Sequence, residues 1–224
     1  MLIYAHRGAS GRLPENTLAA ISGAIADGAD GVEFDVRATA DGVPVLLHDR
    51  DLARTTSGQG PVDALALADL AGIDAGNGER VPTLAEALAA AAGRLRFDIE
   101  VKQSGIEAAV LAEVRRCLDA DWFVSSFDWA ILRAFRALDA AAPLWPLSAT
   151  FNGALLAVAT ELASPGVALA AGAFDADAAA ALADRGLACA VWTVNEPAEA
   201  IRMRSLGAAI LVTDRPAAMR SALA

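Results

Sequence analysis

The sequence predicts an α/β protein with a TIM-like (β/α)8 barrel, and two observations favour this fold class. Short apolar runs rich in β-branched residues alternate with longer alanine-rich segments along the whole chain. Eight such units fit into 224 residues, which is near the lower size limit of a closed barrel. A doubly wound open sheet is the alternative, because it has the same alternation but usually fewer strands.

The candidate strands are short apolar runs, each set off by turn residues or by a helical pattern. In chain order they are Leu2–Ala5, Gly31–Val36, Arg96–Lys102, Trp122–Ser126, Leu144–Ala149, Val167–Ala171, Ala188–Val194 and Ala209–Thr213. A further short run, Pro44–Leu47, predicts an extra strand after the second one. These assignments place one helical segment after nearly every strand, as a barrel requires.

The first helix shows how particular residues mark the start and the end of these helical segments. Leu18, Ile21 and Ile25 follow the i, i+3, i+7 spacing of an amphipathic helix. We expect this helix to open after Pro14, which suits a first turn, and to close at Asp27-Gly28.

The chain is expected to form one domain over residues 1–224, since no linker or low-complexity tract divides it. One irregular stretch, from about residue 49 to 82, is rich in Gly, Asp and Thr. It is long for a connection between a strand and a helix. We therefore expect a small insertion after the second strand that serves as a functional loop or cap.

Charge and hydropathy exclude several classes of partner. The chain has 28 acidic and 18 basic residues, a formal net charge of −10, which argues against binding to nucleic acid or to an anionic membrane. Its alanine-rich runs are interrupted well before the ~18 apolar residues of a membrane span, so no stable membrane insertion is expected. No basic leader precedes His6, and the expected location is cytoplasmic.

Carboxylates lie inside two of the candidate strands. Period-2 alternation sends Glu33 and Asp35 to the same face of their strand, and it does the same for Glu100 and Lys102. A barrel strand has no solvated side, and an unpaired buried carboxylate is destabilised by several kcal/mol or more. A shared divalent cation would resolve this, because oxygen ligands suit Mg²⁺, Mn²⁺ and Ca²⁺.

The alternative for these acids is a set of buried ion pairs with Arg37 or Lys102. Asp98 lies one step deeper than Glu100 on the same face, and we interpret it as structural. Buried acids gather at functional sites more often than in plain cores, which favours the cation.

Two histidines end apolar runs, and basic residues lie next to them. His6 closes the first strand and His48 closes the extra one, so both should lie at the active-site face of a barrel. Imidazole titrates near neutrality, so the pair can divide general-acid and general-base roles. Arg7 and Lys102 suit a phosphate, and Trp192 offers an apolar face for a carbon chain.

Taken together, the motifs resemble the signature series of the glycerophosphodiester phosphodiesterase family. They occur in the family's order, and the resemblance covers essentially the whole chain. The segments that carry it are His6-Arg7-Gly8, Pro14-Glu15-Asn16-Thr17, Glu33-Phe34-Asp35, His48-Asp49, Arg54-Thr55-Thr56, Pro82-Thr83-Leu84, Glu100-Val101-Lys102, Trp192-Thr193-Val194-Asn195 and Thr213-Asp214-Arg215-Pro216.

The resemblance implies a role for each matching residue. Glu33, Asp35 and Glu100 would hold one divalent metal ion, Mg²⁺ first, with Ca²⁺ or Mn²⁺ as alternatives. His6 and His48 would be the acid–base pair. Phosphate binding would fall to Arg7 and Lys102, and contact with a glycerol-like group to Trp192. The insertion would limit access to the site, whereas the segment Thr213–Pro216 is interpreted as a structural turn into the last helix.

The implied activity is hydrolysis of a glycerophosphodiester to glycerol 3-phosphate and an alcohol. A lysophospholipase D-like or other phosphodiesterase acting on a lipid or a different diester is the alternative. The small, apolar residues of Leu147–Thr150 and Leu169–Gly172 leave the preferred alcohol open. Few basic residues and little aromatic surface near the site favour a small, soluble substrate over a lipid. An aldolase-like barrel would have no use for two histidines beside phosphate-type bases, and a non-catalytic diester binder would not need both. A homodimer through the alanine-rich outer helices stays open.

Overall fold

The structure is a computed structural model that describes residues 1–117 and 121–224. Its central feature is a closed barrel of parallel strands. The strands of the barrel are β1 (Leu2–His6), β2 (Gly31–Ala38), β4 (Arg96–Val101), β5 (Trp122–Ser126), β6 (Leu144–Ser148), β7 (Gly166–Ala170), β8 (Ala188–Trp192) and β9 (Ile210–Thr213). Neighbouring strands follow the order β1-β9-β8-β7-β6-β5-β4-β2, and β1 pairs with β2 to close the ring. This closure confirms the predicted barrel over the open doubly wound sheet.

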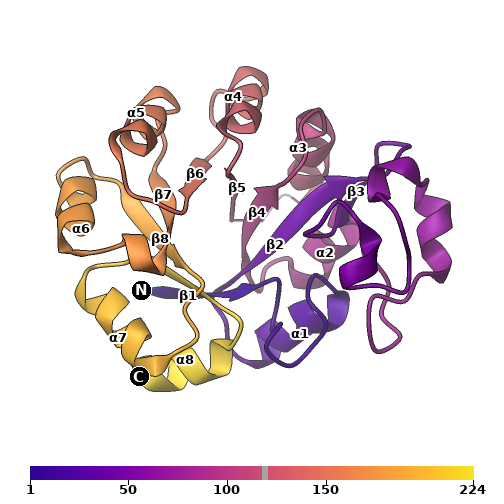
Figure 1. Cartoon of the computed structure of the whole chain (residues 1–224), viewed down its shortest axis with the longest axis horizontal. Helices are drawn as coiled ribbons and strands as arrows, with labels where there is room; N and C mark the ends of the chain where they lie inside the picture. The colour runs from indigo at the N-terminus through magenta and orange to yellow at the C-terminus, as the bar shows by residue number, and fades with distance from the viewer. Residues whose placement is uncertain (118–120) are drawn as a thin grey trace.

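The helices surround the barrel, as Figure 1 shows. They are α1 (Leu18–Ala26), α2 (Leu84–Ala91), α3 (Glu107–Arg116), α4 (Trp129–Leu138), α5 (Gly153–Glu161), α6 (Ala176–Ala183), α7 (Pro197–Ser205) and α8 (Pro216–Leu223). Each buries one face against the strands, as an amphipathic helix outside a barrel does. Within the described ranges, none of the helices is long and apolar enough to cross a bilayer.

The start of α1 differs from the sequence-based expectation. The helix begins at Leu18 rather than just after Pro14, because Thr17 is its N-cap and accepts a hydrogen bond from the amide of Ala20. Asn16, immediately before the cap, has a φ of 58°, in the left-handed region that a right-handed helix cannot include. The residues from Pro14 to Asn16 therefore form a loop, and this loop carries polar side chains toward the barrel.

The core has an outer and an inner part. Between the strands and the helices lies a continuous apolar layer, in which Phe34 and Phe97 are completely buried with ring centroids 6.0 Å apart. Inside the barrel, aromatic side chains fill the end nearer the strand N-termini, where Phe123 stacks on Trp145 at 4.6 Å and also meets Tyr4. Polar chemistry is thereby confined to the other end of the lumen.

The predicted insertion lies between β3 (Pro44–Leu46), which pairs antiparallel with β2, and α2. Residues 49–82 contain three short 3₁₀ helices: η1 (Leu52–Arg54), η2 (Val62–Ala64) and η3 (Leu67–Gly72). They pack on a small apolar cluster of their own and lie beside the barrel, to the right in Figure 1. The assignment of residues 1–224 to one domain stays a prediction.

The outer core makes a direct prediction for stability. Phe135 in α4 is completely buried, whereas Leu138, three residues later in the same helix, is 52% exposed. Phe135→Ala should lower the free energy of unfolding by about 3–5 kcal/mol, because it removes apolar contacts and leaves a cavity. Leu138→Ala, the control in the same helix, should change it by less than about 0.5 kcal/mol. Urea denaturation measures both, and equal effects would contradict this account of the core.

Candidate active site

A cavity of about 130 Å³ lies at the end of the barrel where the strand C-termini meet. Seven of the predicted site residues line it: His6, Arg7, Glu33, His48, Glu100, Lys102 and Trp192. The eighth, Asp35, lies behind them and contacts both Arg7 and Lys102. The structure thus brings together all the side chains that the sequence proposed, from segments as far apart as β1 and β8.

The strand register places the three acids together. β2 and β4 pair so that Asp35 lies directly beside Glu100, while Glu33 lies one pleat deeper on the same face. All three are buried, and each offers an oxygen within 4.8 Å of the others. Three carboxylate oxygens that converge in this way form a donor set suited to one hard divalent cation.

The hydrogen bonding of these acids tests whether a cation fits. Oε1 of Glu33 is buried and accepts no hydrogen bond from the described residues. The buried Oδ1 of Asp35 and Oε1 of Glu100 both face the single ammonium of Lys102. Burial and the adjacent carboxylates raise the pKa values of Glu33 and Glu100, whereas Lys102 and Arg7, acting against burial, hold the pKa of Asp35 below its ordinary value. Buried acceptors without donors are destabilising unless something else coordinates them. The donor set therefore fits a divalent ion.

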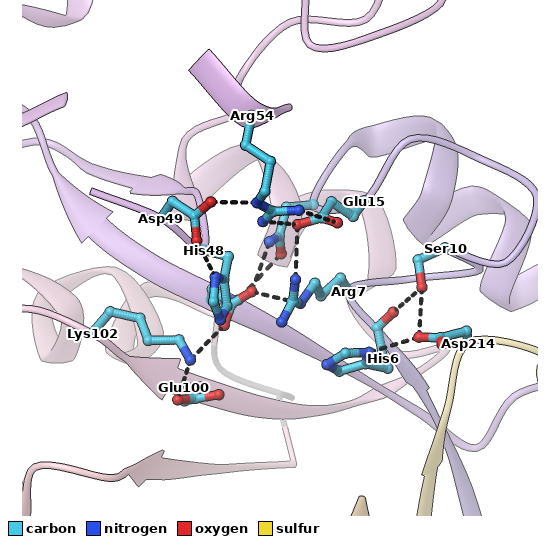
Figure 2. A network of polar contacts seen from close by, with 12 residues as sticks. His6, Arg7, Ser10, Glu15, His48, Asp49, Arg54, Glu100, Lys102 and Asp214 are labelled. Atoms are coloured by element: carbon cyan, nitrogen blue, oxygen red, sulfur yellow. Dashed lines mark hydrogen bonds and ion pairs between the residues drawn. The ribbon is translucent and has the colours of Figure 1, made fainter. Parts of the chain in front are cut away.

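The alternative of buried ion pairs holds for part of this cluster. Lys102 Nζ lies 3.1 Å from Asp35 Oδ1 and also pairs with Glu100, as Figure 2 shows in part. Arg37 does not take part and instead donates to the backbone carbonyl of His48, at 2.8 Å. Among the described residues, no cationic side chain pairs with Oε1 of Glu33. Ion pairing therefore accounts for two of the acids and leaves the third in need of a ligand.

Backbone conformation brings Arg7 into the site. Its φ of 56° is in the left-handed region, and this turn lets the amide of Arg7 donate to Glu33 Oε2 at 2.9 Å. The guanidinium Nε then lies 3.1 Å from Asp35 Oδ2. Asn16 supports the same carboxylate from the loop before α1, donating to Asp35 Oδ2 and accepting from the Asp35 amide.

His48 is held by an aspartate next to it in sequence. Its Nδ1 lies 2.6 Å from Asp49 Oδ1, and the hydrogen bond from Arg54 holds the pKa of Asp49 at about 2. An ionised carboxylate only accepts, so Nδ1 of His48 carries the proton. Burial lowers the pKa of His48, which leaves the ring neutral at neutral pH with an unprotonated Nε2.

His6 is held in the same manner by a residue from the other end of the chain. Its Nδ1 lies 2.7 Å from Asp214 Oδ1, and its Nε2 lies 4.0 Å from Glu33 Oε2. Asp214 also accepts from Ser10 and Asn195. Against burial, the hydrogen bonds from His6, Asn195 and Ser10 hold the pKa of Asp214 at about 2. The segment that the sequence suggested was only a turn thus also orients a candidate catalytic histidine.

Several of these contacts were not foreseen from the sequence. Asp49 and Asp214 could have been suspected because both belong to quoted motifs, but nothing in the spacing pairs Asp214 with His6. Phe127, which follows β5, is 47% exposed, meets Trp192 edge-on at 5.3 Å and has Lys102 Nζ 5.7 Å from its ring centre. An exposed aromatic after a strand was the available signal for this apolar wall.

Asp98 lines the deep part of the cavity beneath the acids. It is buried and accepts a 2.5 Å hydrogen bond from Ser125 Oγ. Burial raises the pKa of Asp98 to about 8, against the effect of that hydrogen bond. At neutral pH Asp98 is therefore largely a neutral acid, in keeping with its interpretation as structural.

Comparison with known proteins gives a consistent result. Residues 6–218 match the family described as "Glycerophosphoryl diester phosphodiesterase family". The protein YhdW of Bacillus subtilis (strain 168) is 32% identical over 231 aligned positions, covering 96% of this chain and 95% of YhdW.

Two solved structures are similar over the full barrel. A phosphodiesterase of Oleispira antarctica, in complex with the product sn-glycerol-3-phosphate, superposes with a TM-score of 0.93 at 29% identity, covering 100% of this chain and 96% of that one. A glycerophosphodiester phosphodiesterase of Agrobacterium tumefaciens str. C58 gives 0.86 at 28% identity, with 99% of each chain covered.

The acidic cluster predicts metal-dependent stability. Mg²⁺, Mn²⁺ or Ca²⁺ at about 100 times its Kd should raise the free energy of unfolding by about 2.7 kcal/mol. In a chain of this size the melting temperature should rise by roughly 5–10 °C relative to EDTA. Glu33→Gln should lose this rise, since it removes a charged ligand without breaking the ion pairs of Lys102. A wild-type protein whose melting temperature with each of the three cations equals that in EDTA would refute the metal site.

Asp98 predicts a pH dependence in EDTA. The unfolded aspartate titrates near ~3.9, whereas the folded one titrates at about 8, so between these values the folded state binds more protons. Stability should therefore fall as pH rises from about 5 to about 8, by up to ~1.4 kcal/mol per pH unit from this residue. In Asp98→Asn, which keeps an acceptor for Ser125, this contribution to the slope should vanish. Urea denaturation at several pH values measures the free energy of unfolding of both proteins. If it changes with pH equally in the wild-type protein and in Asp98→Asn, the raised pKa of Asp98 is contradicted.

Proposed function

This chain belongs to the glycerophosphoryl diester phosphodiesterase family and is a phosphoric diester hydrolase, and we propose that it cleaves glycerophosphodiesters to glycerol 3-phosphate and an alcohol with one divalent cation. One observation carries the proposal: the acidic cluster, two histidines and two basic side chains all converge on a single cavity. The sn-glycerol-3-phosphate held by the Oleispira antarctica enzyme, which has the same fold, supports the product.

The cation would be held by Glu33, Asp35 and Glu100, with Mg²⁺ as the first candidate and Ca²⁺ or Mn²⁺ as alternatives. When bound, it supplies positive charge that neutralises a phosphate oxygen and stabilises the developing charge there. The chain's own positive charges act on the same group. Arg7 offers guanidinium donors and Lys102 an ammonium, both lining the cavity next to the acids.

The two histidines divide the proton transfers. His48, neutral because its pKa is lowered, accepts at Nε2 the proton of the attacking hydroxyl, which belongs to water or to the glycerol group itself. The attacking oxygen forms a bond to phosphorus while the bond to the alcohol oxygen breaks. Attack by water gives glycerol 3-phosphate directly, whereas attack by the glycerol hydroxyl gives a cyclic phosphate that a water molecule must then open. His6, held through Nδ1 by Asp214, then donates a proton to the departing oxygen. Asp49 and Asp214 each keep one ring in the orientation that its transfer requires.

The size and walls of the cavity favour a small substrate. Trp192 and Phe127 provide an aromatic face for the carbons of a glycerol group, and Leu147 and Ala168 close the apolar side. A cavity of about 130 Å³ accommodates a glycerol-sized diester better than a long acyl chain. The lysophospholipase D-like alternative needs an apolar path out of this cavity. The cytoplasmic location and the homodimer stay predictions.

Product release tests the proposed function. Glycerophosphocholine should yield glycerol 3-phosphate, activity should disappear in EDTA, and Mg²⁺, Mn²⁺ or Ca²⁺ should restore it. His6→Ala and His48→Ala should each lower kcat by roughly 10²–10⁴, the scale of one general acid or base. A folded His48→Ala protein with near-normal turnover would overturn its role as base. Faster cleavage of lysophosphatidylcholine than of glycerophosphocholine would instead favour the lipid alternative.

A further inference from the structure

Arg54 contacts two carboxylates while contributing no group to the cavity lining. It ends η1, the first 3₁₀ helix of the insertion. Its Nη2 lies 2.8 Å from Glu15 Oε1 and its Nη1 lies 3.2 Å from Glu15 Oε2, while its Nε pairs with Asp49. Figure 2 shows this guanidinium between the two acids. A planar fork can hold two carboxylates at once, whereas a lysine ammonium is a point charge.

Each of these carboxylates leads to a different functional side chain. Glu15 Oε1 also accepts from Arg7 Nη1, at 2.9 Å, so one oxygen is shared between the two guanidinium groups. Asp49 Oδ1 lies 2.6 Å from His48 Nδ1, while its Oδ2 faces Arg54. Arg54 is thus one contact away from both a phosphate-binding residue and a catalytic histidine.

The burial along this path increases towards the cavity. The side chain of Arg54 is 46% exposed, that of Glu15 is 22% exposed and that of Arg7 is 16% exposed. Opposing burial, the hydrogen bond from Arg54 lowers the pKa of Glu15, which therefore stays ionised between its two partners. The ion pairs run from the surface of the insertion to the edge of the acidic cluster.

We propose that Arg54 is a positioning residue of the insertion, and that it fixes the orientation of Arg7 through Glu15 and of His48 through Asp49 at the same time. Within the described residues, the insertion contributes none to the cavity lining. Through Arg54 it would still act on the site, since phosphate binding and proton transfer share one anchor outside the barrel. The inference rests on the proposed function for the roles of Arg7 and His48.

A merely structural surface ion pair is the competing explanation, and the chain contains a matched example. Arg50, in the same segment and 67% exposed, donates from Nε to both carboxylate oxygens of Asp63, at 3.0 and 3.2 Å. Its guanidinium makes no contact with Arg7 or His48 among the polar contacts of the described residues. Arg50→Ala therefore removes an ion pair from the insertion without disturbing the path to the cavity.

Steady-state kinetics on glycerophosphocholine separates the two explanations. Arg54→Ala should lower kcat/KM by roughly 10–100-fold through both a higher KM and a lower kcat, because small misplacements of binding and catalytic groups slow the reaction. Glu15→Gln should act mainly on KM and Asp49→Asn mainly on kcat. Arg54→Lys should resemble Arg54→Ala, since it keeps the charge and loses the fork. Arg50→Ala should match the wild-type protein.

Double variants test the connectivity itself. Arg54→Ala combined with Glu15→Gln, or with Asp49→Asn, should be less impaired than the product of the single effects, because residues on one path are coupled. When Arg54→Ala is combined with Asp214→Asn, which acts on His6, the effects of the two substitutions on kcat/KM should multiply. Multiplication in all three pairs would overturn the proposal. So would wild-type kcat and KM in Arg54→Ala or in Arg54→Lys.

Two readouts that need no turnover keep this proposal separate from the proposed function. The NMR resonance of the His48 Nδ1 proton should shift in Arg54→Ala and disappear in Asp49→Asn, while Arg50→Ala leaves it unchanged. Inorganic phosphate should bind more weakly to Arg54→Ala and Glu15→Gln in calorimetry. A wild-type protein without hydrolytic activity would sink the proposed function alone, whereas unchanged resonance and unchanged phosphate affinity in Arg54→Ala would sink the positioning role.

Discussion

A carboxylate inside a closed barrel has no water to face, and Asp35, with no exposed surface, is the residue on which the site depends. Its charge is tolerable only because Arg7, Lys102 and Asn16 approach it from different segments. Removing any one partner of such a buried group leaves charge uncompensated, which is strongly destabilising. The left-handed turns at Arg7 and Asn16 follow from this need, because they direct those residues towards the acid.

The same constraint explains why the site contains so many paired groups. Each histidine lies between the cavity and an ionised aspartate, and each aspartate is held by further donors, Arg54 for Asp49 and Asn195 for Asp214. Each charged group is therefore paired with one farther from the cavity, from the acidic cluster outward to the insertion and to the end of β9. At the opposite end of the lumen, stacked aromatic side chains exclude water and leave the charged groups only one open face.

Much of the fold and of the candidate site could be predicted from the sequence, because both depend on the local periodicity of the strands and helices. The alternation of strands and helices predicted the barrel, and all eight of its strands were located to within about two residues. Period-2 spacing placed Glu33 and Asp35 on one face, and both histidines were assigned to strand ends near the cavity. The insertion could be located because its composition differs from that of the helices around it. Only the first turn of α1 was misplaced, since Pro14 resembles a helix start and the cap at Thr17 is a weaker signal.

Long-range pairing was decided by the tertiary structure alone. Closure of the ring between β1 and β2, and the register that sets Asp35 beside Glu100, depend on strand neighbours that no spacing in the chain specifies. The contact between His6 and Asp214 joins residues 208 positions apart, so its geometry exists only once the barrel has closed. The sequence by itself determined which side chains face the lumen, because that is a property of each strand. Which of them touch was left to the fold, because contact distances arise from the packing of separate strands around one axis.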